Sequence, residues 1–167
     1  CEMLANAALL HDIGKTKVPL EILNKPGRFE PHELAEMRKH TLYGEEILID
    51  MGGISEEMMF IATQHHEMWD GSGYPHKLTG QQIHRFGQMT AIADVYDALT
   101  AARVYKPALP PHFALNRIYG NRDKEFSADI VDLFIKSLGL YPVGSLVLLN
   151  TEEVGIVYEP NPLNPKK

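Results

Sequence analysis

Glycine and proline interrupt this chain at short intervals, and they limit it to a series of short helices. Between the interruptions, apolar residues recur three and four positions apart, which is the spacing of one face of an α-helix. This spacing predicts helices over residues 1–13, 30–51, 55–67, 86–105, 112–120 and 127–138. Gly14 is expected to end the first helix, and Pro19 to prevent an immediate restart. Two glycines and a proline force a loop over 69–77.

The end of the chain changes to residues that favour strands. β-Branched and apolar residues fill 145–149 and 154–158 on either side of a polar turn, which is typical of a β-hairpin. We therefore predict an all-α fold, a helical bundle with a small C-terminal β-hairpin. With 167 residues, the chain is long enough for about one domain. Its predicted parts are a helical domain over 1–142, a hairpin extension over 143–160 and an extended tail over 161–167.

Composition excludes several classes of protein. A single cysteine, at position 1, rules out an internal disulfide framework and any zinc site built from several cysteines. The net charge of −6 argues against a surface that coats DNA. The apolar runs are only a few residues long, far short of the roughly 20 that a membrane helix needs. With no signal peptide recognisable either, we expect a protein of the reducing cytoplasm.

Imidazole and carboxylate side chains stand at predicted helix ends and on one helix face. They are His11, Asp12, His40, His65, His66 and Asp94. Taken singly, each has an ordinary explanation as a surface pair or a solvated helix residue. Asp94 is more telling, because an unpaired charge buried in an apolar helix costs several kcal/mol, so a cation or strong donors should be nearby. Together the residues indicate a metal centre in a helical bundle. Without cysteine ligands, an open catalytic site is favoured over a closed structural one.

Positively charged residues accompany these candidate ligands. Lys15 follows the first His-Asp pair by three residues and is placed to meet an anionic group beside the metals. Asp94 and Asp97 lie three apart and share a helix face, which Arg103 and Lys106 extend with positive charge. Such cations suit a phosphate ester. The alternative is that Arg103 and Lys106 are ordinary solvated residues at a helix end.

In order and spacing, these residues fall into motifs that resemble the HD-GYP family of metal-dependent phosphodiesterases. The motifs are HDIGKTKVP at 11–19, H-x-x-x-G at 40–44, HHE followed by DGSGYP at 65–75, and IADVYDALTAARVYK at 92–106. The resemblance implies an HD-domain-like helical bundle. It also implies hydrolysis of a cyclic dinucleotide second messenger, cyclic di-GMP or 3'3'-cyclic GMP-AMP, to a linear dinucleotide and further to mononucleotides.

The resemblance also implies a set of site residues. The metal ligands would be His11, Asp12, His40, His65, His66 and Asp94, with Asp12 bridging two or three divalent ions. Iron is the expected metal, with manganese or nickel as alternatives. Asp12 and Lys15 would be catalytic, and Lys15, Asp97, Arg103 and Lys106 would contact substrate. The GYP loop, Gly73, Tyr74 and Pro75, would recognise a partner such as a diguanylate-cyclase-type signalling protein. A homodimer is also expected.

The chain departs from the family pattern in two places. The family supplies a further histidine, and in some members a glutamate, from a helix several turns before the His-Asp pair. This chain starts only ten residues before His11, so either the domain is trimmed at this end or its upstream part is not included in this sequence. An N-terminal regulatory domain is expected in the parent protein. Met68 stands where a basic residue is expected. Two other functions remain open: a non-catalytic module that binds cyclic dinucleotide or a partner protein, and a general HD-type nucleotide phosphohydrolase.

Overall fold

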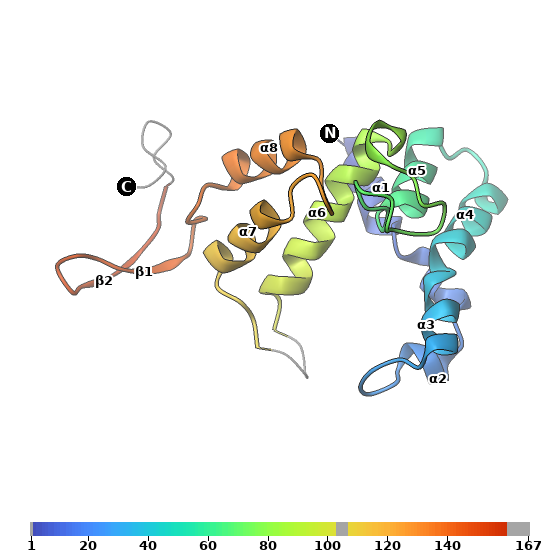
Figure 1. Ribbon diagram of the computed structural model, residues 1–167, viewed down its shortest axis with the longest axis horizontal. Coiled ribbons are helices and arrows are strands. Elements are labelled where there is room, and N and C mark those ends of the chain that lie inside the picture. Colours follow the sequence, from blue (N-terminus) through green and yellow to red (C-terminus); the bar gives the residue numbers. More distant parts are fainter. Residues whose placement is uncertain (1, 103–106, 160–167) are drawn as a thin grey trace. The chain divides into compact units, whose positions relative to one another are not determined.

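The computed structural model describes residues 2–102 and 107–159, and it confirms a mostly helical fold with a small antiparallel sheet (Figure 1). The α-helices are α1 (Glu2–Leu10), α2 (Leu20–Leu23), α3 (Pro31–Arg38), α4 (His40–Met51), α5 (Glu56–Gln64), α6 (Arg85–Thr100), α7 (Pro111–Gly120) and α8 (Ala128–Leu138). The short 3₁₀ helices are η1 (Ile13–Lys17) and η2 (Gly80–Gln82). The predicted tail over 161–167, and the candidate substrate residues Arg103 and Lys106, lie outside the described residues. No helix in the described ranges has the length and apolar character of a membrane span.

Contacts between residues divide the chain into two compact units. The first holds residues 1–91 with 123–125, and the second holds 92–122 with 126–167. In the first unit, α4 packs on η1 and on α5, and α5 also packs on α1. Leu48 of α4 and Ile61 of α5 are among its fully buried core residues. Helix packing in this unit therefore surrounds the segments that carry the HD and HHE motifs.

The single helix predicted over 30–51 is wrong, because the chain breaks at Lys39 into α3 and α4. His40 Nδ1 lies 2.7 Å from the carbonyl oxygen of Met37, and the Thr41 hydroxyl donates to that of Arg38 at 3.1 Å. These side chains occupy carbonyl oxygens that a continuous helix would pair with backbone N–H groups. The break places His40 at the start of a new helix.

Four other helix boundaries differ from the prediction. Helix α1 ends at Leu10, three residues early, and Gly14 lies within η1 instead of ending the first helix. Helix α2 begins directly after Pro19, whose carbonyl oxygen accepts the N–H of Ile22 at 3.0 Å, so this proline starts a helix instead of preventing one. Helix α5 ends at Gln64, three residues early. Helix α6 ends at Thr100, and residues 101 and 102 are not helical. The Leu99 carbonyl oxygen instead accepts the N–H of Leu109, at 2.9 Å.

The second unit contains most of α6, together with α7, α8 and the hairpin. Helices α7 and α8 pack together and confirm the helices predicted over 112–120 and 127–138. Ile118 of α7 and Val131 of α8 are completely buried. Strands β1 (Leu146–Leu148) and β2 (Val154–Ile156) pair in antiparallel register, with Leu146 opposite Ile156, which confirms the predicted hairpin.

Candidate metal centre

Four of the predicted ligands come together in the first unit. One ligand atom each from Asp12, His40, His65 and His66 lies within 4.8 Å of the others. Asp12 precedes η1, His40 opens α4, and the two adjacent histidines follow α5. The cluster is largely withdrawn from solvent, because His40 is 1% exposed and His65 is 2% exposed.

Gly14 holds η1 against the start of α4. A Cβ at this position would lie 1.9 Å from the carbonyl oxygen of His40 and 2.4 Å from the backbone nitrogen of Gly44. Any side chain here would force the two segments apart, so the close approach requires glycine. Gly14 therefore lets Asp12 lie beside His40.

The imidazoles of His40 and His65 have their Nδ1 atoms against backbone carbonyl oxygens. His40 Nδ1 lies 2.7 Å from that of Met37. His65 Nδ1 lies 3.0 Å from that of Ala62. A carbonyl oxygen only accepts hydrogen bonds, so these contacts assign the hydrogen of each neutral ring to Nδ1 and leave a lone pair on Nε2. The same backbone contact orients metal-binding histidines in proteins generally.

The space between the ring nitrogens and Asp12 is lined by electron-pair donors. His40 Nε2 and His65 Nε2 are 3.4 Å apart, and they lie 3.4 and 3.7 Å from Asp12 Oδ1. Asp12 Oδ1 is buried and accepts no hydrogen bond from the residues that the structure describes. Facing lone pairs and a carboxylate oxygen repel one another unless a cation lies between them. The donor set of nitrogen and carboxylate oxygen therefore fits a divalent metal ion.

Electrostatics keep Asp12, His40 and His66 in the protonation states that a metal requires. Burial lowers the pKa of His40, and burial together with the neighbouring His65 and His40 lowers the pKa of His66 to about 2. Burial alone would raise the pKa of Asp12, but the neighbouring side chains of His11, His65 and Lys15 hold it well below its usual range. Neutral imidazoles and an ionised carboxylate are the ligand forms that bind metal.

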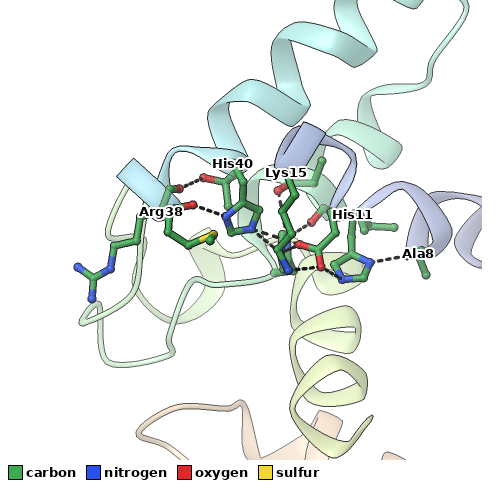
Figure 2. A network of polar contacts seen from close by, with 11 residues as sticks. Ala8, His11, Lys15, Arg38 and His40 are labelled. Atoms are coloured by element: carbon green, nitrogen blue, oxygen red, sulfur yellow. Dashed lines mark hydrogen bonds and ion pairs between the residues drawn. The ribbon is translucent and has the colours of Figure 1, made fainter. Parts of the chain in front are cut away.

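Lys15 and His11, both labelled in Figure 2, lie against the second oxygen of Asp12. Lys15 Nζ lies 2.5 Å from Asp12 Oδ2, and His11 Nε2 lies 3.3 Å from the same atom. His11 Nδ1 lies 2.5 Å from the carbonyl oxygen of Ala8, so its ring is oriented by the backbone in the same manner as that of His40. Asp12 thus has one oxygen toward the cluster and the other toward an ammonium group.

Glu67 anchors the GYP loop, a role that the sequence reasoning missed. This carboxylate is 3% exposed and accepts the backbone N–H groups of His76 at 2.7 Å and Leu78 at 3.0 Å. Gly73 permits the loop to fold back, because a Cβ there would lie 2.3 Å from the backbone nitrogen of Met68. The sequence feature that could have indicated this role is an acidic residue between a histidine pair and a loop rich in glycine.

Tyr74 of the loop lies directly on the cluster. Its ring stacks on that of His66, with the centroids 4.8 Å apart and the planes inclined by 25°. The guanidinium carbon of Arg38 lies 5.0 Å from the centroid of the same tyrosine ring. Met68, the departure from the family pattern, accepts a hydrogen bond from the Ser72 hydroxyl through its sulfur at 3.2 Å. The loop is therefore joined to the candidate metal centre by an aromatic contact.

A model of the HD domain matches residues 1–130, which covers most of the chain and all of the motifs. The chain belongs to the HD-GYP family of HD domains.

Curated relatives of this HD-GYP chain are cyclic-dinucleotide phosphodiesterases by name. The cyclic di-GMP phosphodiesterase PA4108 of Pseudomonas aeruginosa is 40% identical over 92% of this chain and 37% of its own length. The 3'3'-cGAMP-specific phosphodiesterase 2 of Vibrio cholerae is 41% identical over 81% of this chain and 26% of its own length. A cyclic di-GMP phosphodiesterase of Thermotoga maritima is 41% identical over 78% of this chain and 36% of its own length. The chain thus spans between a quarter and two-fifths of these relatives.

Solved structures share the fold of this HD-GYP chain. Bd1817, an HDG"Y"P protein from Bdellovibrio bacteriovorus, matches with a TM-score of 0.60 at 23% identity, over 78% of this chain and 41% of that one. The cyclic GMP-AMP-specific phosphodiesterase V-cGAP3 of V. cholerae matches with a TM-score of 0.55 at 15% identity, over 80% of this chain and 38% of that one. At these identities the likeness concerns the fold alone.

The remaining predicted residues of the HD-GYP motifs lie in the second unit or outside the described residues. Asp94 and Asp97 are on α6 in the second unit, where Asp94 is half-buried and Asp97 is exposed. Arg103 and Lys106 follow the end of α6 and are not among the described residues. The structure therefore brings together four of the predicted ligands, Asp12, His40, His65 and His66, with His11 and Lys15 beside Asp12, and leaves the fourth motif as a prediction.

Proposed function

We propose that this HD-GYP domain hydrolyses a phosphodiester bond of a cyclic dinucleotide, cyclic di-GMP or 3'3'-cyclic GMP-AMP, to a linear dinucleotide and further to mononucleotides. The observation that carries the proposal is the buried set of lone pairs around Asp12 Oδ1, which calls for a cation. Relatives at about 40% identity that are named as phosphodiesterases of these two substrates support the choice of reaction.

The proposed centre holds two or three divalent ions, iron first, with manganese or nickel as alternatives. Its proposed ligands are His11, Asp12, His40, His65, His66 and Asp94. When bound, such ions act as Lewis acids on the phosphodiester and lower the pKa of water. Asp12 is the proposed bridging ligand, since a carboxylate has an oxygen for each of two ions.

The side chains of this chain have separate tasks in the proposed reaction. The Lys15 ammonium, 2.5 Å from Asp12 Oδ2, faces the edge of the cluster and neutralises charge that develops on the phosphate oxygens. Asp97, Arg103 and Lys106 are proposed to hold the rest of the substrate. Burial of His40 and His65 keeps bulk water away from the ligand atoms and strengthens their electrostatic interactions with substrate.

The proposed biological setting is signalling in the cytoplasm. The GYP loop, over residues 73–75, is proposed to bind a signalling protein such as a diguanylate cyclase, and the domain is proposed to form a homodimer. Tyr74 suits a role at an interface, because it lies on a partly exposed loop and its ring stacks on His66 of the cluster.

Asp12→Ala in the intact protein tests the proposal, with the exposed Asp50 on α4 as a matched control. Since residues that only support metal ligands cost about 10- to 100-fold, loss of a bridging ligand is expected to lower hydrolysis at least about 100-fold. Metal content should fall with it, and Asp50→Ala should change neither. Unchanged metal content and hydrolysis in Asp12→Ala would contradict the proposal.

Assays of binding and of turnover on competing substrates distinguish the proposed function from the two other functions. Wild-type protein that binds cyclic dinucleotide and metal without turnover is a non-catalytic signalling module. Wild-type protein that cleaves mononucleotide substrates in preference to cyclic di-GMP in direct competition is a general HD-type phosphohydrolase. Preferential cleavage of a cyclic dinucleotide supports the proposed function.

A further inference from the structure

A positively charged side chain stands beside the GYP loop and has no acidic partner among the residues that the structure describes. Arg38 ends α3, its side chain is exposed, and its guanidinium carbon lies 5.0 Å from the centroid of the Tyr74 ring. Among residues 2–102 and 107–159, no carboxylate lies within ion-pair distance of this guanidinium. The next cation along the chain differs, since Lys39 Nζ lies 2.6 Å from Glu36 Oε2. Arg38 therefore carries a positive charge that the described residues do not neutralise.

Tyr74 fixes where this charge lies with respect to the candidate metal centre. Its ring centroid is 4.8 Å from that of His66 and 6.4 Å from that of His40. The Tyr74 ring thus contacts both the guanidinium and the histidine cluster. In Figure 2, Arg38 lies on the opposite side of His40 from Lys15. Two cations therefore lie near His40, one on either side of it in this view.

We propose that Arg38 binds the phosphodiester of the cyclic dinucleotide that is not being cleaved, while Lys15 meets the one at the metal centre. This inference rests on the proposed function. A cyclic dinucleotide carries two phosphodiesters, each with a negative charge, so a site for the whole ring gains from positive charge at two places. Contact with the Tyr74 face holds the guanidinium and leaves N–H groups at its edge for paired hydrogen bonds to phosphate oxygens.

Arg38 is on this assignment a specificity residue. It favours substrates with two phosphodiesters over those with one, because its charge lies beside the metal centre and not within it. Bis(4-nitrophenyl) phosphate offers the metal centre one phosphodiester and offers Arg38 nothing. Comparison of the two substrates therefore separates the role of Arg38 from that of the cluster.

The experiment measures KM and kcat for cyclic di-GMP and for bis(4-nitrophenyl) phosphate with the intact, metal-loaded protein. It also measures the Kd of a hydrolysis-resistant phosphorothioate analogue of cyclic di-GMP by calorimetry. Arg38→Ala is expected to raise the KM and Kd of the cyclic dinucleotide about tenfold, because the variant loses a charge-assisted hydrogen bond to the phosphate. The kcat, the metal content and the KM of the simple diester should not change.

Two further variants complete the test. Arg38→Lys keeps the charge but not the paired hydrogen bonds, and its affinity is expected to fall between wild type and Arg38→Ala. Arg28→Ala removes another exposed arginine of the first unit and is expected to alter no parameter.

Three results would overturn the inference. An unchanged Kd in Arg38→Ala means that Arg38 does not contact the substrate. Equal losses on both substrates, or a loss of metal, mean that Arg38 acts only by supporting Tyr74 and His66. Wild-type protein that cleaves the simple diester but neither binds nor cleaves the cyclic dinucleotide overturns the proposed function itself, and the inference with it.

Discussion

His66 and Tyr74 stack with their ring centroids 4.8 Å apart and their planes inclined by 25°. The backbone adds a second link, because the N–H of Tyr74 donates to the carbonyl oxygen of His66 at 3.1 Å. The GYP loop and the histidine cluster are thus joined through both side chains and main chain. Changes to residues that shape this loop or its supports are therefore expected to alter the candidate metal centre.

Gly14→Ala is expected to destabilise the protein and to weaken metal binding. The new Cβ would lie 1.9 Å from the His40 carbonyl oxygen, so η1 and α4 must separate, and overpacking of this kind costs about 1–3 kcal/mol or more. Urea unfolding gives the loss of stability, and metal titration gives the loss of affinity. Gly120→Ala is the matched control, because no atom lies within 4 Å of a Cβ there. Equal stabilities of Gly14→Ala and Gly120→Ala would contradict the packing of η1 on α4.

Glu67→Ala is expected to release the GYP loop. The substitution leaves the N–H groups of His76 and Leu78 without their acceptor, and each charge-assisted hydrogen bond contributes about 1.5–3 kcal/mol. Hydrogen exchange should show faster exchange of these two amides, and urea unfolding should show a lower free energy of unfolding. Glu46→Ala removes an exposed glutamate that pairs with Lys17 on the surface, and should have little effect. Unaltered hydrogen exchange in Glu67→Ala would show that the GYP loop keeps its conformation without the Glu67 carboxylate.

Stability of the metal-free protein is expected to fall as the pH drops below about 6.5. Burial, with help from His65 and His40, lowers the pKa of His66 to about 2. Between these two pH values the unfolded chain binds a proton at His66 that the folded protein does not, so stability rises with pH across this window. One such group contributes a slope of at most about 1.4 kcal/mol per pH unit.

His66→Asn measures this contribution, with urea unfolding followed from pH 6.5 to pH 4.5. The slope of stability against pH should decrease by about one bound proton. His32→Asn is the control, because its side chain is exposed in the folded protein and its loss should leave the slope as it was. A His66→Asn slope equal to that of wild type would mean that His66 takes up its proton without unfolding.

The spacing of apolar residues, together with the glycine and proline breaks between helices, was sufficient to predict the fold class. The helices α7 and α8 and the hairpin lie where apolar spacing and turn residues placed them. The break at Lys39 could not be predicted in this way, because it depends on side-chain contacts of His40 and Thr41 with the carbonyl oxygens of the preceding turn. The spacing of apolar residues does not show whether a carbonyl oxygen will bond to a backbone N–H group or to a side chain.

The candidate site was predictable where motif residues carry the chemistry themselves. Asp12 and the three clustered histidines are of the residue types that bind metals, and the structure brings them together. The role of Glu67 could not be predicted from the sequence. Its carboxylate accepts the backbone N–H groups of residues 76 and 78, and this contact forms only when the loop has folded back. Arg38 escaped notice for the same reason, since its partner Tyr74 is remote in sequence.

Lys15→Met is expected to lower kcat/KM for the cyclic dinucleotide about 100- to 1,000-fold, the usual cost of removing a group that stabilises transition-state charge. Metal content near neutral pH should persist, because the cluster donors remain. Lys15 is also one of the groups that lower the pKa of Asp12, so its loss raises that pKa and shifts the acid limit of metal binding to higher pH. Lys17→Met, in the same 3₁₀ helix and paired with Glu46, is the control and should match wild type. A shifted acid limit with unchanged kcat/KM would make Lys15 a partner of Asp12 alone, without contact to the phosphate.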